Sequence, residues 1–116
     1  EALELKKSTI LASLLTVRKD NDIDFEEFAS YDKYLDETLE SADNVYEYED
    51  EEGDTINTFI KSFCIDKHSF FFVVLTQQYK TEKDISILPI LGFPSTDNEI
   101  FTHFATGKKI NETLKN

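Results

Sequence analysis

Apolar positions at the start of the chain follow a helical repeat between residues 2 and 18. One stripe of that helix would hold Leu3, Ile10, Leu14 and Val17, widened by Leu11 and Leu15. Two basic residues, Arg18 and Lys19, follow near its end, where they suit the negative pole of the helix dipole. This pattern predicts a first helix over residues 2 to 18.

A second helical repeat covers residues 25 to 42. Its apolar positions recur at spacings of three and four: Phe28, Tyr31, Leu35, Leu39 and Ala42. Asp24 is suited to the N-cap, and Glu27 stands three residues later, as in a capping box. Ile23 and Phe28 are placed to form the accompanying hydrophobic staple.

After residue 43 the repeat changes to alternation, which is typical of strands. In "NVYEYED" two tyrosines share one face and acids stand between them. Further strands are expected in "TINTFIKSFCI", "FFFVVLTQQY", "ISILPIL" and "EIFTHFA". The turns expected between them are "EEGD", "DKHS" and "KTEKD", and "GFPSTDN" is expected to form a loop. "FFFVVL" suits a strand that is buried on both faces, and Pro89 places its strand at a sheet edge or ends it early.

These elements predict one α+β domain over residues 1 to 116, and 40% hydrophobic residues suffice for a single core. Short loops favour antiparallel neighbours. We therefore expect two N-terminal helices, at about 2–18 and 25–42, packed on one face of a roughly five-stranded antiparallel meander. The sheet is expected over about 44–105, followed by a polar tail over 106–116.

Charge is distributed unevenly along this chain. The net charge is −12, yet residues 20 to 54 hold 16 of the 24 acidic residues and a single base, Lys33. The remaining residues are close to neutral. A segment of this kind either forms a solvated face or attracts a basic partner.

Within the acidic segment, "IDFEEF" resembles the second half of an EF-hand calcium loop and the start of its exiting helix. The resemblance covers about six residues. In that alignment Thr16 would take the first ligand position and Arg18 the third, and an arginine cannot ligate a divalent cation. A capped acidic helix explains the same residues without calcium.

Candidate catalytic residues are few: Cys64, His68 and His103. Cys64 lies in a strand-like context, where cysteine usually behaves as a small apolar residue, and the two histidines lack the closely spaced ligands of a zinc site. With three glycines the chain has no phosphate-binding loop, and its acidic segment would repel nucleic acid. We expect no catalytic residues, no metal and no cofactor.

Binding is better supported than catalysis. Bacterial immunity proteins that neutralise nuclease toxins are similar in type: small, acidic and devoid of catalytic groups. We expect a protein-binding inhibitor of a basic, nuclease-like toxin that covers its cationic groove. The expected partner-binding residues lie on the second helix and first hairpin: Asp32, Asp36, Glu37, Glu40, Tyr46, Glu47, Tyr48, Glu49, Asp50, Glu51 and Glu52.

Other functions remain open. They are an acidic secretion chaperone, which would dimerise, a DNA mimic, and a small ligand-binding or enzymatic domain. For the inhibitor we expect a monomer that does not bind membranes or nucleic acid. A single cysteine favours a reducing, cytoplasmic compartment, although a cleaved signal peptide is also compatible with the sequence.

Overall fold

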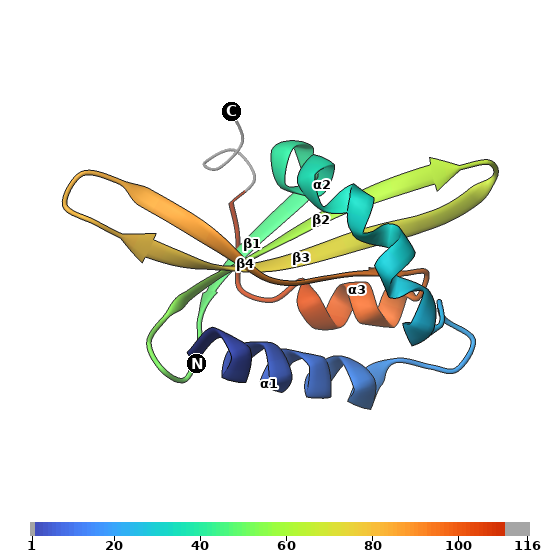
Figure 1. The fold of residues 1–116 in the computed structure, drawn as a ribbon, viewed down its shortest axis with the longest axis horizontal. Coiled ribbons are helices and arrows are strands. Elements are labelled where there is room, and N and C mark those ends of the chain that lie inside the picture. The colour runs from blue at the N-terminus through green and yellow to red at the C-terminus, as the bar shows by residue number, and fades with distance from the viewer. Residues whose placement is uncertain (1, 111–116) are drawn as a thin grey trace.

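The computed structural model describes residues 2–110 and has the α+β class expected from the sequence. The helices at the start of the chain are followed by the long strands, and then by one more helix and a short last strand (Figure 1). In chain order the elements are α1 (Ala2–Val17), the 3-10 helix η1 (Phe25–Tyr34), α2 (Leu35–Ser41), β1 (Asn44–Glu49), β2 (Thr55–Ile65), β3 (His68–Lys80), β4 (Ile85–Ser95), α3 (Asn98–Phe104) and β5 (Lys108–Lys109).

All strands form one antiparallel sheet in the order β4-β3-β2-β1-β5. The first four strands are the predicted meander. Gly53 lies in the β1–β2 turn with a φ of 85°, a value that glycine adopts freely. The β2–β3 loop has two residues, Asp66 and Lys67, with φ of 50° and 70°, as a type I′ hairpin turn requires.

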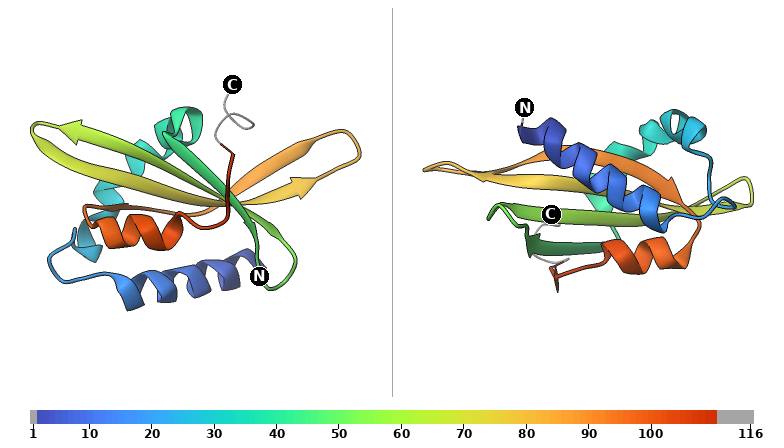
Figure 2. Two further views of the ribbon diagram at one scale, coloured as in Figure 1. Left: turned by 180° about the vertical axis from the view of Figure 1, so that it is seen from behind. Right: turned by 90° about the horizontal axis from the view of Figure 1, so that it is seen from below.

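Strand β3 carries the core on both of its faces, as its uninterrupted apolar run predicts. Its odd-numbered residues Phe71, Val73 and Leu75 belong to one buried cluster. The even-numbered Phe72 and Val74 belong to the other, because successive side chains of a strand point to opposite faces. The sheet is therefore the middle layer of the molecule, with helices on both sides (Figure 2).

The two N-terminal helices are divided between these faces, so the expected packing on one face holds only roughly. Leu14 of α1 packs in the Phe71 cluster, together with Ile100 of α3. Leu35 and Leu39 of α2 pack against the Phe72 cluster. The 3-10 helix η1 connects the two sides by crossing β4.

The second expected helix is continuous but changes type. Residues 25–34 form 3-10 turns, and only Leu35–Ser41 is α-helical. Asp24 is at the N-cap as predicted, but its side chain makes no capping hydrogen bond, so the expected capping box is not formed. The N–H of Glu27 donates instead to the backbone carbonyl of Asp24 at 2.9 Å, and this 3-10 type of bond satisfies the donor without a side chain.

The predicted last strand, "EIFTHFA", is wrong, because Asn98–Phe104 is the helix α3. Asp97 caps it by accepting a hydrogen bond from the Glu99 N–H at 2.9 Å. Ile100 and Phe104, four residues apart, are both buried, so the helical spacing prevails over the strand-like alternation in this short segment.

Two neighbouring predictions also change. The expected loop "GFPSTDN" continues β4 as far as Ser95. The expected polar tail contains β5, which pairs with Tyr46 and Glu47 of β1; residues 111–116 of that tail lie outside the described residues. Pro89 is on an edge strand as predicted, beside a bulge in the β3–β4 ladder.

Candidate protein-binding surface

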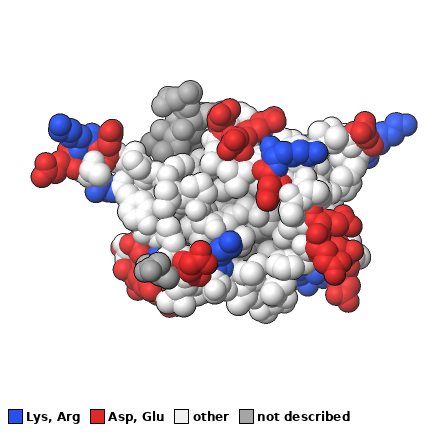
Figure 3. Space-filling view, in the orientation of Figure 1, with Lys and Arg blue, Asp and Glu red and all other residues white. Residues whose placement is uncertain are grey.

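The structure separates the acidic segment into two regions. We call the exposed carboxylates of η1 and α2 the acidic ridge: Glu26, Glu27, Asp32, Asp36, Glu37 and Glu40. We call the carboxylates at and around the β1–β2 turn the acidic turn: Glu49, Asp50, Glu51, Glu52 and Asp54. Acidic side chains accordingly gather in separate groups on the surface rather than on one continuous face (Figure 3).

The acidic turn is bound by the protein's own lysine. The Lys6 ammonium lies 2.6 Å from Asp50, 2.5 Å from Glu52 and 2.8 Å from Asp54. These three carboxylates lie within 4.8 Å of one another, which is the spacing of a cation site, and the cation that they hold is this ammonium group. The contact fastens the β1–β2 turn to the first turns of α1.

The protonation equilibria of this cluster follow from its contacts. Burial alone would lower the pKa of Lys6, but hydrogen bonds to Asp50, Asp54 and Glu52 raise that pKa well above its ordinary value. Burial alone would likewise raise the pKa of Asp50. This effect of burial is outweighed by hydrogen bonds from Lys6 and from the backbone N–H groups of Asp54 and Glu52. The pKa of Asp50 is therefore lowered.

Lys6 is a residue that the sequence analysis missed. It is 7% exposed, because it stands three residues after Leu3 and four before Ile10 and so lies on the apolar stripe of α1. Leu15, which was expected to widen that stripe, is 51% exposed. The sequence did contain a signal for this contact: a lysine on a buried stripe needs a carboxylate partner, and the chain is rich in carboxylates.

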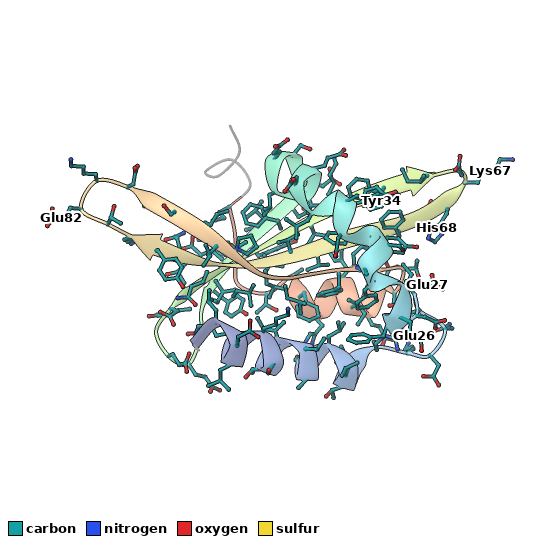
Figure 4. All side chains as sticks on the ribbon, viewed as in Figure 1. Glu26, Glu27, Tyr34, Lys67, His68 and Glu82 are labelled. Carbon is teal, nitrogen blue, oxygen red and sulfur yellow. The ribbon has the colours of Figure 1, made fainter. Side chains whose placement is uncertain are left out.

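The part of the chain that the structure describes supplies no such counterion to the acidic ridge. Its six carboxylates belong to a 17-residue helical segment, Phe25–Ser41, whose single base is Lys33. Among residues 2–110, every ion pair is made by Lys6 or Lys19, and none of these pairs includes a ridge carboxylate. Lys33 itself lies over the ring of Tyr34, 5.5 Å from its centroid. Glu26 and Glu27 lie at the start of η1, at the end of the ridge that is farthest from α2 (Figure 4).

Of the β1 residues expected at the interface, Tyr46, Glu47 and Tyr48 are half-buried and Glu49 is exposed. Tyr46 and Tyr48 pack against the Phe71 cluster, as the alternation of this strand allows. Burial, and then the charge of Asp50, raises the pKa of Tyr48. Glu47 faces the other side of the sheet, where it accepts a hydrogen bond from Asn57 at 3.4 Å.

Asp22, which directly precedes the stretch that resembles half of an EF-hand, has a structural role. One oxygen of its buried carboxylate accepts hydrogen bonds from the N–H and hydroxyl of Thr96 and from the N–H of Ile23. The other oxygen accepts from the Ser95 hydroxyl at 2.5 Å. Asp22 therefore joins the loop after α1 to the loop before α3.

The candidate catalytic residues lie on separate elements. Cys64 is exposed on β2, in a groove with Ser69 and Thr96 that no histidine lines. His68 is within 3.1 Å of the Tyr31 hydroxyl, and His103 on α3 is within 2.8 Å of the Ser13 hydroxyl. The described residues bring no thiol and imidazole together.

No helix within residues 2–110 is both long enough and apolar enough to cross a membrane. No protein-family model, curated protein or solved structure matches the chain.

Proposed function

We propose that the protein is a small acidic inhibitor that binds a basic protein partner through the acidic ridge. The partner class is a nuclease-like toxin domain, which the protein neutralises by covering a cationic active-site groove. The observation that carries this proposal is a contrast in counterions within residues 2–110: all six ridge carboxylates are exposed and make no ion pair, whereas three of the five carboxylates of the acidic turn are held by Lys6.

The mechanism is electrostatic steering followed by steric exclusion. Unpaired carboxylates on one helical segment produce a local negative potential that raises the encounter rate with a cationic surface. Such steered pairs associate at roughly 10⁸ M⁻¹s⁻¹ or faster at low salt, and the rate falls as salt screens the charges. Once docked, the body of the inhibitor denies substrate access to the groove.

The proposal narrows the set of residues expected from the sequence. Asp32, Asp36, Glu37 and Glu40 remain partner-binding candidates because they are exposed and make no ion pair within residues 2–110. Glu49 and Glu51 meet the same two conditions, so the experiment compares them with the ridge. Asp50 and Glu52 are weaker candidates, since docking through them competes with Lys6.

The test compares charge removal in the two regions. A ridge variant carries Asp36→Asn and Glu40→Gln; a matched turn variant carries Glu49→Gln and Glu51→Gln, which remove the same number of charges and spare the Lys6 contacts. Basic proteins are recovered from a lysate of the source organism at low and high salt, and association with each purified binder is then timed by stopped flow.

The proposal predicts that the ridge variant associates at least about tenfold more slowly at low salt, because steering is lost, and that the turn variant stays close to wild type. Addition of the protein should also block the nuclease activity of the purified binder. Equal association rates for the two variants would refute docking through the ridge. A partner that keeps its activity when saturated would refute the proposed inhibition.

A further inference from the structure

Residues 2–110 leave part of the sheet face that α2 covers open toward the β3–β4 hairpin. This hairpin extends beyond the helices, with Glu82 at its tip (Figure 4). A groove of about 450 Å³ lies here, between Leu39 of α2 and Ile85 and Ile87 of β4, with Phe59 of β2 among its lining residues. Ile85 is 61% exposed, so its side chain has little contact within the described part of the chain.

Two carboxylates of the acidic ridge, Asp36 and Glu40, lie beside Leu39 on the surface of α2. Successive residues of an α-helix are about 100° apart, which places Asp36 about 60° and Glu40 about 100° round from Leu39 in the same direction. The buried Thr38 and Ala42 lie in the other direction. Leu39 is therefore the boundary between the packed face of α2 and its acidic face, and it lines the groove from that position.

The polar lining of the groove itself contains one charged side chain of each sign. Glu47 lines the groove from β1, and Lys80 on the hairpin is the single base among the lining residues. The surroundings of the groove thus combine an apolar surface with the carboxylates of Asp36, Glu40 and Glu47.

We propose that this groove binds a cationic amphipathic segment of the partner. Its apolar side chains would lie on Leu39, Phe59, Ile85 and Ile87, and its lysines or arginines would reach the carboxylates on the α2 side. This mode, an amphipathic element laid in an apolar groove, needs both parts of the surface. The inference rests on the proposed function and specifies the surface that performs it.

β4 offers a matched pair of variants. Ile85 faces the groove, whereas Leu88, 44% exposed on the same strand, pairs with Gln77 and lies on the opposite face of the hairpin. Ile85→Ser and Leu88→Ser remove similar exposed apolar surface without changing charge, and neither residue belongs to the buried clusters.

The probes are three synthetic peptides of about 14 residues: a leucine–lysine peptide with its leucines on one helical face, the same composition with leucines spread round the helix, and oligolysine. Binding is measured by fluorescence anisotropy at low and high salt. We expect the amphipathic peptide to bind wild type and Leu88→Ser equally, and Ile85→Ser about tenfold more weakly, because one apolar contact is lost.

Other outcomes would overturn the inference, and they show whether the proposed function fails with it or stands without it. Equal binding of the amphipathic peptide to all three proteins would exclude the groove, while salt-dependent oligolysine binding that requires the ridge would keep the proposed function. Absence of salt-dependent binding by every peptide would count against both. A wild-type dimer that Ile85→Ser converts to a monomer would show that a second copy occupies the groove, which also overturns the inference.

Discussion

The acidic turn has five carboxylates and the acidic ridge has six, yet the fold uses the two groups differently. In the turn, Asp50, Glu52 and Asp54 surround the Lys6 ammonium and anchor a hairpin to α1. In the ridge, the carboxylates lie on the exposed side of helices whose other side packs on the sheet. A run of acids therefore indicates an available binding surface only after the counterions supplied by the fold are known.

Removal of Lys6 is expected to have the largest effect on this comparison. Lys6→Met leaves three carboxylates close together without a cation, so we expect the free energy of unfolding to fall by about 1–3 kcal/mol. Lys7→Met is the control, because Lys7 is exposed, and it should change stability by less than about 0.5 kcal/mol. Urea denaturation measures both; equal stabilities for the two variants would mean that the turn is not anchored by Lys6.

Lowering the pH should destabilise the acidic turn because it protonates Asp50. Its pKa is lowered in the folded protein, so its contribution to stability is present above the unfolded-state pKa of about 4 and is lost as the pH falls through the folded value. Asp50→Asn should therefore flatten the loss of stability between about pH 5 and pH 3.

The control for this pH profile is Glu51→Gln in the same turn, which removes an exposed carboxylate that the Lys6 ion pairs do not include. It should keep the wild-type slope. Thermal unfolding at stepped pH gives the profiles, and parallel curves for wild type and Asp50→Asn would contradict the assigned role of Asp50.

The smallest change in stability is expected for substitutions in the ridge. Asp36 and Glu40 are four residues apart on α2, where like charges destabilise a helix by about 0.2–0.5 kcal/mol. Glu40→Gln should therefore raise stability by a few tenths of a kcal/mol at low salt, with the gain disappearing at high salt. A loss of more than about 1 kcal/mol in urea denaturation would show that Glu40 has a structural partner and that the two regions do not differ as described.

The meander could be predicted from the sequence because its signals are local and agree with one another. Three features each follow from a few neighbouring residues: the apolar run from Phe71 to Leu75, the turn at Gly53 and the edge position of Pro89. The last helix was missed because its seven residues satisfy both helical and strand spacing, and the cap from Asp97 decides between them.

The candidate site was less predictable because it depends on contacts distant in sequence. Lys6 and Asp50 are 44 residues apart, and no local pattern reports that they meet. The division of the acidic segment between two regions likewise follows from η1 crossing β4, which amphipathicity alone does not specify.

The carboxylate of Asp22 makes the first helix depend on the far end of the chain. Its contact with Ser95 joins residues 73 positions apart, and a buried carboxylate without donors is costly. During synthesis, the loop after α1 can acquire these partners only once the fourth strand has emerged from the ribosome. The docking of α1 is thus expected among the late events of folding, after the meander has paired.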